Sequence, residues 1–518
     1  MREATEIARL RLFLKMVAVV DVDEMADNLG LDPLPDIDFN IRCGNTLVGF
    51  ANPQGVKDAI LPPGEFQLYT EAYDKVEAKA ADISDLYERF KSLQQTAEGS
   101  PEFYDAKKKL NAKLAVLNDE LDRAMAQRQY SINPDTLRGN KEFEEWKRKT
   151  QPFHWYSEFY GITVANGGFD VIIGNPPYVE YSKVKDYKIF GYTTEDCGDL
   201  YAFVMERSLL LSQINARLGM IVPVSIESTD GFRSLRVLMR EEAAKVWNSS
   251  YSIRPSKLFE GVEKRVTISI AVKGETVNHD QYVTKYHAWN AVERQALFEV
   301  LTYVMLPVHE YISQPKLHNA YALSILDKIF KDQSIEMAYS SVGKYPVYHT
   351  RKFRYFVQFL DVPPKIVDAN GQPQVTSELK EITFDTNELR YVALAVYQSN
   401  LFSWFVFVFS DCRNLNRREV AQFPFNLLGC SNLDLQELAK KGRDIVKNLQ
   451  KHSSLVEMNF AKLGTMNVQV FQPRESKPII DEIDELLAKH YGFTEEELDF
   501  IINYDIKYRM GDKLKDAE

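Results

Sequence analysis

The stretch Gly168–Tyr181, reading GFDVIIGNPPYVEY, combines a clear strand pattern with an unusual polar loop. Phe169–Ile173 is short, mostly apolar and rich in β-branched residues, and Gly174 ends it. A run of this kind predicts a buried strand, most simply a parallel one. In an open α/β sheet, ligands bind beyond the carboxyl ends of the strands. The residues that follow Gly174 are therefore expected to lie where chemistry is placed.

The loop after this strand is Asn175-Pro176-Pro177-Tyr178. The two prolines fix φ and lack an N–H, so the backbone is stiff and its carbonyls point in set directions. Asn175 adds a side-chain acceptor and Tyr178 a flat aromatic face. These groups suit a flat ligand that carries an amino group, such as an adenine rotated out of a duplex. The alternative is a proline-rich loop without chemistry, but its place after a strand favours the functional interpretation.

The sequence Asn175-Pro176-Pro177-Tyr178 resembles the catalytic motif of adenine-specific DNA methyltransferases. These enzymes transfer a methyl group from S-adenosylmethionine to N6 of adenine in double-stranded DNA. The order of the segments from about residue 1 to residue 511 resembles the gamma class, in particular methylases of type IIG restriction–modification and of BREX-type phage exclusion. The resemblance implies that Asn175 and the Pro176 carbonyl accept from the target amino group. It also implies that Tyr178 and Phe259 hold the base.

The segments around the motif predict an α/β fold. Gly219–Pro223 and Val266–Val272 are typical of strands, and Phe232–Lys245 is typical of a helix. This alternation favours a Rossmann-like, doubly wound methyltransferase sheet. The predicted domains are a partial methyltransferase catalytic domain at 1–64 and 131–279, an inserted helical hairpin at 65–130, a DNA target-recognition domain at 280–474 and C-terminal helices at 475–518.

The cofactor-binding half of the resembling family is represented only in part. Residues 3–20 predict an amphipathic helix, which in the family follows a glycine-rich cofactor loop, and no such loop occurs elsewhere in the sequence. The sheet is therefore expected to be truncated at its N-terminal side, with another polypeptide supplying the loop. Asn45 lies where the family has a polar residue facing the cofactor or the target, although a simple turn asparagine fits equally well.

Two alternatives remain for the function of the chain. It could be a catalytically incomplete DNA-binding fragment or one half of a split methylase, because the cofactor loop is absent. It could also methylate an RNA or a protein amide with the same motif. The large C-terminal region, which resembles DNA target-recognition modules, argues against the second alternative.

Two basic and aromatic clusters, at 343–355 and 413–418, predict contacts to DNA phosphates and base edges. Surface charge on an ordinary domain is the alternative. The residues expected to bind DNA are Lys344, Arg351, Lys352, Arg354, Arg413, Arg417 and Arg418.

The composition sets wider bounds. A net charge of −11 over 518 residues counts against a plain nucleic-acid binder, although a basic cleft can exist locally. Four scattered cysteines without a CxxC pair favour a reducing cytoplasm and argue against structural zinc. No metal site, signal peptide or membrane span is expected. His154 is expected to pack rather than catalyse, and Asn400–Phe409 to form buried core.

Overall fold

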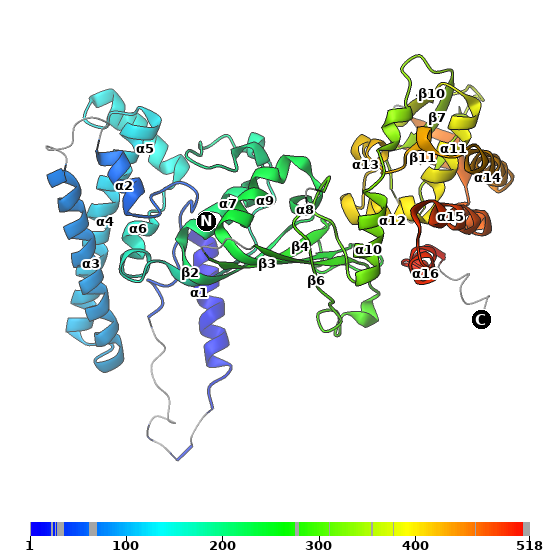
Figure 1. Ribbon diagram of the computed structural model, residues 1–518. Helices are drawn as coiled ribbons and strands as arrows, with labels where there is room; N and C mark the ends of the chain where they lie inside the picture. The colour runs from blue at the N-terminus through cyan, green and yellow to red at the C-terminus, as the bar shows by residue number, and fades with distance from the viewer. Residues whose placement is uncertain are drawn as a thin grey trace. The chain divides into compact units, whose positions relative to one another are not determined.

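The computed structural model describes residues 2–21, 24–25, 27, 36–61, 70–274, 279–309, 311–353, 356–376, 378–461 and 463–510. The chain divides into two compact units (Figure 1). Unit 1 comprises residues 1–220, 234–245 and 270–279, and unit 2 comprises residues 221–233, 246–269 and 280–518.

The largest sheet has the strand order β1-β2-β4-β3-β5-β6. Its strands are β1 (Phe169–Gly174), β2 (Ser212–Pro223), β3 (Ala243–Tyr251), β4 (Val266–Lys273), β5 (Asp280–His287) and β6 (Val304–Met305). β1 runs parallel to β2, whereas β5 and β6 are antiparallel. The chain is therefore a mixed α/β protein with a mixed sheet, and the strands predicted around 219–223 and 266–272 are present.

One predicted helix is shorter than expected. Helix α9 spans Arg233–Glu242, and β3 begins at the next residue, so residues 243–245 belong to a strand. The error arises because Ala243, Ala244 and Lys245 are good helix formers in isolation. Their pairing within the sheet overrides that preference, as tertiary context often does.

Strand β1 is less buried than its sequence suggests. It lies at one end of the strand order, so β2 is its only strand neighbour among the described residues. The side chains of Val171 and Ile173 are 57% and 79% exposed. The prediction of a parallel strand is confirmed, whereas the prediction of a buried one is wrong, because Val171 and Ile173 lie on the same face of the strand and that face is exposed.

Unit 1 contains the predicted helical hairpin. Its helices are α3 (Thr70–Thr96) and α4 (Pro101–Tyr130), which lie side by side in Figure 1. Ser100 caps α4, since its hydroxyl accepts from the Phe103 N–H at 3.1 Å. Leu110 and Leu117 are fully buried in the core that the hairpin shares with α2 (Pro53–Ile60) and α6 (Trp155–Glu158). Residues 65–69 of the predicted insertion lie outside the described residues.

The first helix of unit 1, α1 (Arg2–Val17), has no fully buried side chain among its described residues. Ile7, Leu10 and Leu14 are each more than half exposed. Arg9 ties the helix to the following loop through its guanidinium, which donates to the Ile41 carbonyl at 3.1 Å. The remaining helices of unit 1 are α5 (Leu137–Thr150) and α7 (Leu200–Leu211).

Unit 2 is built around α12 (Asn400–Phe409), whose ten residues are all buried, as predicted. Two three-stranded sheets have the orders β10-β7-β8 and β11-β12-β9. Their strands are β7 (Tyr345–Thr350), β8 (Phe359–Leu360), β9 (Ile366–Asp368), β10 (Leu379–Phe384), β11 (Ser453–Phe460) and β12 (Gly464–Phe471). Its other helices are α8 (Ser225–Ser228), α10 (Ala320–Ile329), α11 (Asn387–Gln398), α13 (Arg417–Ala421), α14 (Asn432–Lys451), α15 (Lys477–Tyr491), α16 (Glu495–Ile502) and α17 (Ile506–Met510).

The C-terminal helices share the core of unit 2. Ile480, Ile483 and Ile501 are buried in the same cluster as Trp404. The spacing of Thr494 and Glu497 in the sequence predicts a capping box at the start of α16, and the structure confirms it: each side chain accepts from the backbone N–H of the other residue. Among the described residues no single helix is long and apolar enough to cross a membrane. The helix pair that passes this test jointly, α11 and α12, is bent by 62°.

A buried carboxylate gives unit 2 a pH-dependent stability. Asp484 accepts from the backbone N–H groups of Asn400 and Leu401 at 2.9 and 3.0 Å, and it caps the start of α12. Burial raises the pKa of Asp484 from 3.8 to about 7. The unfolded chain therefore releases this proton at lower pH than the folded chain. The free energy of unfolding should fall between pH 4 and pH 7, by up to about 1.4 kcal/mol per pH unit.

We expect Asp484→Asn to remove this part of the pH dependence, because the amide keeps the shape and one acceptor oxygen but does not titrate. Urea unfolding of both proteins at four pH values from 4.5 to 7.5 measures the difference in slope. Parallel pH profiles for the variant and the parent would contradict the assignment.

Candidate functional site

The Asn175–Tyr178 loop leaves the carboxyl end of β1, as the sequence predicts. Pro176 is buried, Asn175 and Pro177 are exposed, and Tyr178 is partly buried. The Tyr178 hydroxyl donates to Asn175 Oδ1 at 2.7 Å. Burial raises the pKa of Tyr178 to about 12, so the phenol is protonated at neutral pH and remains a donor. The two polar side chains of the motif are therefore already oriented toward one another.

The chain that follows the loop is fixed to the start of α7. The Leu200 N–H donates to the Val179 carbonyl at 2.9 Å, and the Tyr181 N–H donates to the Gly198 carbonyl at 2.8 Å. These bonds restrain the exit of the loop, while its two prolines restrain the entry. An amide oxygen has two lone pairs, so Asn175 Oδ1 can accept from a ligand amino group while it still accepts from Tyr178.

Two further predicted residues have different surroundings. Phe259 lies in unit 2, on the segment between β3 and β4, and its side chain is 40% exposed. Asn45 lies in unit 1, where its Oδ1 accepts from the Leu47 N–H at 3.2 Å and its own N–H donates to the Gln151 carbonyl at 2.7 Å. Asn45 therefore has the hydrogen bonding of a turn residue, which is the simpler of its two interpretations.

His154 is a packing residue, as expected from the sequence. It is 2% exposed, and its Nδ1 accepts from the Phe50 N–H at 3.1 Å. Nε2 must then carry the proton, and it lies 3.0 Å from Asp122 Oδ1. The sequence does not point to Asp122 as the partner, because Asp122 lies within the hairpin helix α4 and no local pattern connects it to His154.

The structure brings the two basic clusters of unit 2 together. The Phe353 N–H donates to the Arg413 carbonyl at 3.0 Å, and the Leu415 N–H donates to the Arg351 carbonyl at 2.6 Å. Lys352 and Asn414 form an antiparallel bridge between them. Segments that are far apart in the sequence thus form one basic surface.

The predicted DNA-binding side chains differ in solvent exposure. Those of Lys344, Arg351, Lys352, Arg413 and Arg417 are exposed. Lys352 pairs with Glu378 at 3.1 Å, a contact between two exposed groups that solvent weakens. Arg354 lies outside the described residues.

Arg418 is not available for DNA, and this part of the prediction is corrected. Its side chain is 14% exposed and pairs with Asp230 and Glu419, both at 2.6 Å. The same guanidinium donates to the Ser228 carbonyl at 2.6 Å and to the Phe409 carbonyl at 3.0 Å. Arg418 therefore holds α13 within unit 2. Sequence alone could not distinguish Arg418 from Arg417, because the two are adjacent arginines that differ only in the direction in which their side chains point.

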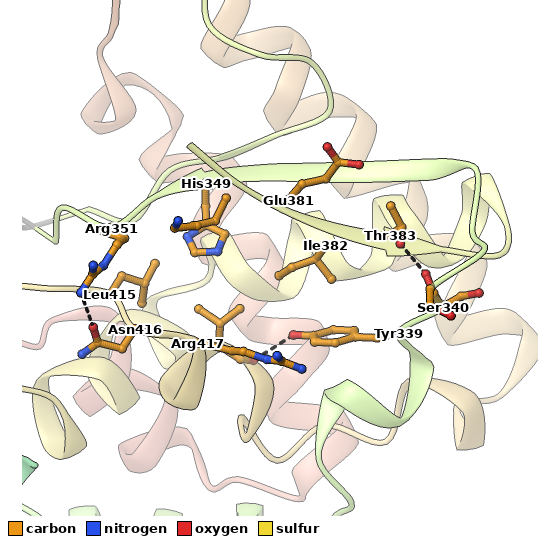
Figure 2. Close-up of a pocket in the computed structure, with 13 residues that line it drawn as sticks. Tyr339, Ser340, His349, Arg351, Glu381, Ile382, Thr383, Leu415, Asn416 and Arg417 are labelled. Atoms are coloured by element: carbon orange, nitrogen blue, oxygen red, sulfur yellow. Dashed lines mark hydrogen bonds between the residues drawn. The ribbon is translucent and has the colours of Figure 1, made fainter. Parts of the chain in front are cut away.

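The paired clusters also line a cavity of about 610 Å³, which the sequence did not indicate (Figure 2). Its lining combines cationic, aromatic, hydroxyl and apolar groups. The residues are Tyr339, Ser340, Ser341, His349, Arg351, Lys380, Glu381, Ile382, Thr383, Leu415, Asn416, Arg417 and Val420. Within the described part of the chain, no group of three His, Cys, Asp or Glu side chains is arranged to hold a metal ion.

Comparison with known proteins gives a family match for the N-terminal part of the chain. Residues 1–248 match the family model of the Eco57I restriction-modification methylase. This region includes β1 and the Asn175–Tyr178 loop. The chain is also 24% identical over 404 residues to a Methanocaldococcus jannaschii protein described as a putative type II restriction enzyme and methyltransferase. That match covers 69% of this chain and 33% of the relative, so the chain spans about a third of the relative's length.

Among solved structures, the chain is similar to the type IIL restriction-modification enzyme MmeI in complex with DNA, with 11% identity and a TM-score of 0.38 over 65% of this chain and 57% of that one. It is also similar to the DrdV–DNA complex, with 10% identity and a TM-score of 0.30 over 75% and 62% of the two chains. Both scores are low, and neither likeness supports a further conclusion.

Proposed function

We propose that this chain provides the catalytic loop and the DNA-recognition region of an adenine-specific DNA methyltransferase in a restriction–modification or phage-defence system. The observation that carries the proposal is the hydrogen-bonded pair of Asn175 and Tyr178 at the carboxyl end of β1. This pair lies within the residues that match a restriction-modification methylase family, which supports the proposal. The protein is proposed to work in the cytoplasm on double-stranded DNA.

The chemistry follows from the groups in this loop. The target adenine leaves the base stack, and its N6 amino group donates to Asn175 Oδ1 and the Pro176 carbonyl. These bonds reduce delocalisation of the nitrogen lone pair into the ring. The Tyr178 ring holds the base in place. When bound, S-adenosylmethionine would supply the methyl group: N6 would form the new N–C bond as the S–C bond breaks, and would release one proton.

The rate gain in this scheme comes from positioning, because no covalent enzyme intermediate is needed. Two fixed acceptors and a stiff proline backbone keep the amino group in one orientation. The Tyr178 hydroxyl is a donor at neutral pH, and its hydrogen bond to Asn175 Oδ1 fixes the orientation of the Asn175 amide.

The described residues do not form a cofactor cradle that we can identify. Asn45, the predicted contact, already accepts from the Leu47 N–H. We therefore propose that a second polypeptide segment provides the glycine-rich loop. Two surfaces support this proposal. One is the edge of β1 that no described strand pairs with, and the other is the set of exposed apolar side chains of α1. A neighbouring strand would cover both surfaces. The alternative is a DNA-binding fragment without catalysis.

Binding of DNA is proposed to depend on the basic surface of unit 2. Replacing Arg351, Lys352, Arg413 and Arg417 together by glutamine should weaken duplex binding. It should also lower the slope of log K against log salt by about 3 to 4, since each lost phosphate contact removes about 0.9. Fluorescence anisotropy with a labelled duplex at four salt concentrations measures both quantities.

Lys108→Gln is the matched control, because Lys108 is an exposed lysine on α4 and lies in the other unit. It should leave the salt slope unchanged. If the control lowers the slope by as much per charge as the quadruple variant, binding reflects overall charge and the proposed surface is not the DNA site.

A further inference from the structure

The cavity beside the basic surface has unpaired positive charge at its rim. Arg351 donates to Asn416 Oδ1 at 3.3 Å, but neither Arg351 nor Arg417 forms an ion pair with a carboxylate in the described part of the chain. Glu381 also lines the cavity, yet Figure 2 shows its carboxylate pointing to the opposite side of the strand from His349. The groups directed into the cavity therefore favour an anion.

The interior of the cavity offers an apolar wall. Ile382 comes from β10, Leu415 from the segment before α13, and Val420 from α13 itself. Leu415 and Val420 are almost fully buried, and Ile382 is partly buried. A wall of this kind suits a flat, weakly polar ring, and the Tyr339 ring adds an aromatic side.

One buried polar group faces this wall. His349 is 4% exposed, and Figure 2 shows its ring directed from β7 into the cavity. Its Nδ1 lies 3.3 Å from the Thr350 carbonyl, which can only accept, so Nδ1 carries the proton. Burial lowers the pKa of His349 to about 4, so the ring is neutral. Nε2 is then an acceptor with no hydrogen-bond partner among the described residues.

We propose that this cavity binds a nucleotide unit. The phosphate lies at Arg351 and Arg417, where two guanidinium groups provide charge-assisted hydrogen bonds. The base lies on the wall formed by Ile382 and Leu415, and one of its N–H groups donates to His349 Nε2. The nucleotide is either part of a DNA strand or free in solution. The first source rests on the proposed function, and the second does not.

Thymidine 5′-monophosphate is the probe, because thymine has an N3–H donor and is not the adenine that the Asn175 loop is proposed to hold. In calorimetric titrations of the whole chain, it should bind at least about tenfold more tightly than thymidine or inorganic phosphate. Arg351→Gln and Arg417→Gln should each lower its affinity about tenfold, a loss of about 1.4 kcal/mol. Lys440→Gln, a charge change at an exposed lysine on α14 outside the cavity lining, should not.

Ser341→Trp tests the shape of the site, since Ser341 is exposed and lines the cavity. The bulky ring should weaken binding of the nucleotide and spare binding of inorganic phosphate. Equal affinities for nucleotide and phosphate, or an affinity that both arginine variants leave intact, would overturn the proposal. Competition by duplex DNA would assign the nucleotide to a DNA strand, and simultaneous binding would assign it to free nucleotide. Loss of N6 methylation without loss of nucleotide binding would indicate a defect at the Asn175 loop and would leave the proposed nucleotide site intact.

Discussion

Replacing Asn175 by alanine should lower methyl transfer by about 10²- to 10³-fold, a typical loss for one hydrogen bond that positions a reacting group. The enzyme for this test is the 518-residue chain reconstituted with a polypeptide that supplies the cofactor loop. Binding of duplex DNA should change little, because Asn175 is proposed to act on the extruded base and not on phosphates. Transfer of labelled methyl groups and duplex titration provide the two measurements.

Tyr178 provides the matched pair of variants. Tyr178→Ala removes the ring and should lower transfer about as strongly as Asn175→Ala. Tyr178→Phe keeps the ring and removes only the hydroxyl that donates to Asn175 Oδ1, so its effect should stay below about tenfold. Turnover near the parent level in Asn175→Ala or Tyr178→Ala would remove that residue from the site. Equal losses in Tyr178→Phe and Tyr178→Ala would show that the hydroxyl matters more than the ring.

The second large effect concerns the cofactor. The 518-residue chain by itself should bind S-adenosylmethionine weakly or not detectably. A fragment that carries a strand and a glycine-rich loop, fused or added in trans, should tighten binding at least about 100-fold, or about 2.7 kcal/mol. The physical reason is that glycine allows the backbone to approach a ligand closely. The edge of β1 that lacks a partner among the described strands is the surface proposed to receive the fragment.

Isothermal titration of the chain, alone and with the fragment, measures this effect. A fragment whose loop glycines are replaced by valine is the control, because it can still pair with β1 but its backbone cannot approach the cofactor. Micromolar binding by the chain alone would contradict the expectation. Restoration by the valine fragment would show that the loop is not the missing part.

Local signals in the sequence located several elements correctly. The strand at 169–173, the buried core at 400–409 and the capping box at Thr494 depend on neighbouring residues, which a sequence displays directly. The exposure of β1 could not be predicted in this way, because it depends on what packs against the face that carries Val171 and Ile173. Residues 243–245 were misassigned for the same reason, since a long-range partner changed their conformation.

The candidate sites likewise divide into features that depend on adjacent residues and features that depend on long-range contacts. The Asn175–Tyr178 motif is contiguous, so its residue types alone suggest a chemistry. The pairing of the two basic clusters is a long-range contact and appears only in the fold. Arg417 and Arg418 are adjacent and chemically equal, yet one is exposed and the other is held by Asp230 and Glu419.

The most direct test of the central claim is the identity of the methylated base. DNA should be isolated from cells that express this chain together with the proposed cofactor-loop polypeptide, digested to nucleosides and analysed by mass spectrometry. The account predicts N6-methyladenine with the parent chain and a near-complete loss of it with Asn175→Ala. Methylated cytosine in place of N6-methyladenine, or N6-methyladenine that persists in the Asn175→Ala variant, would contradict it.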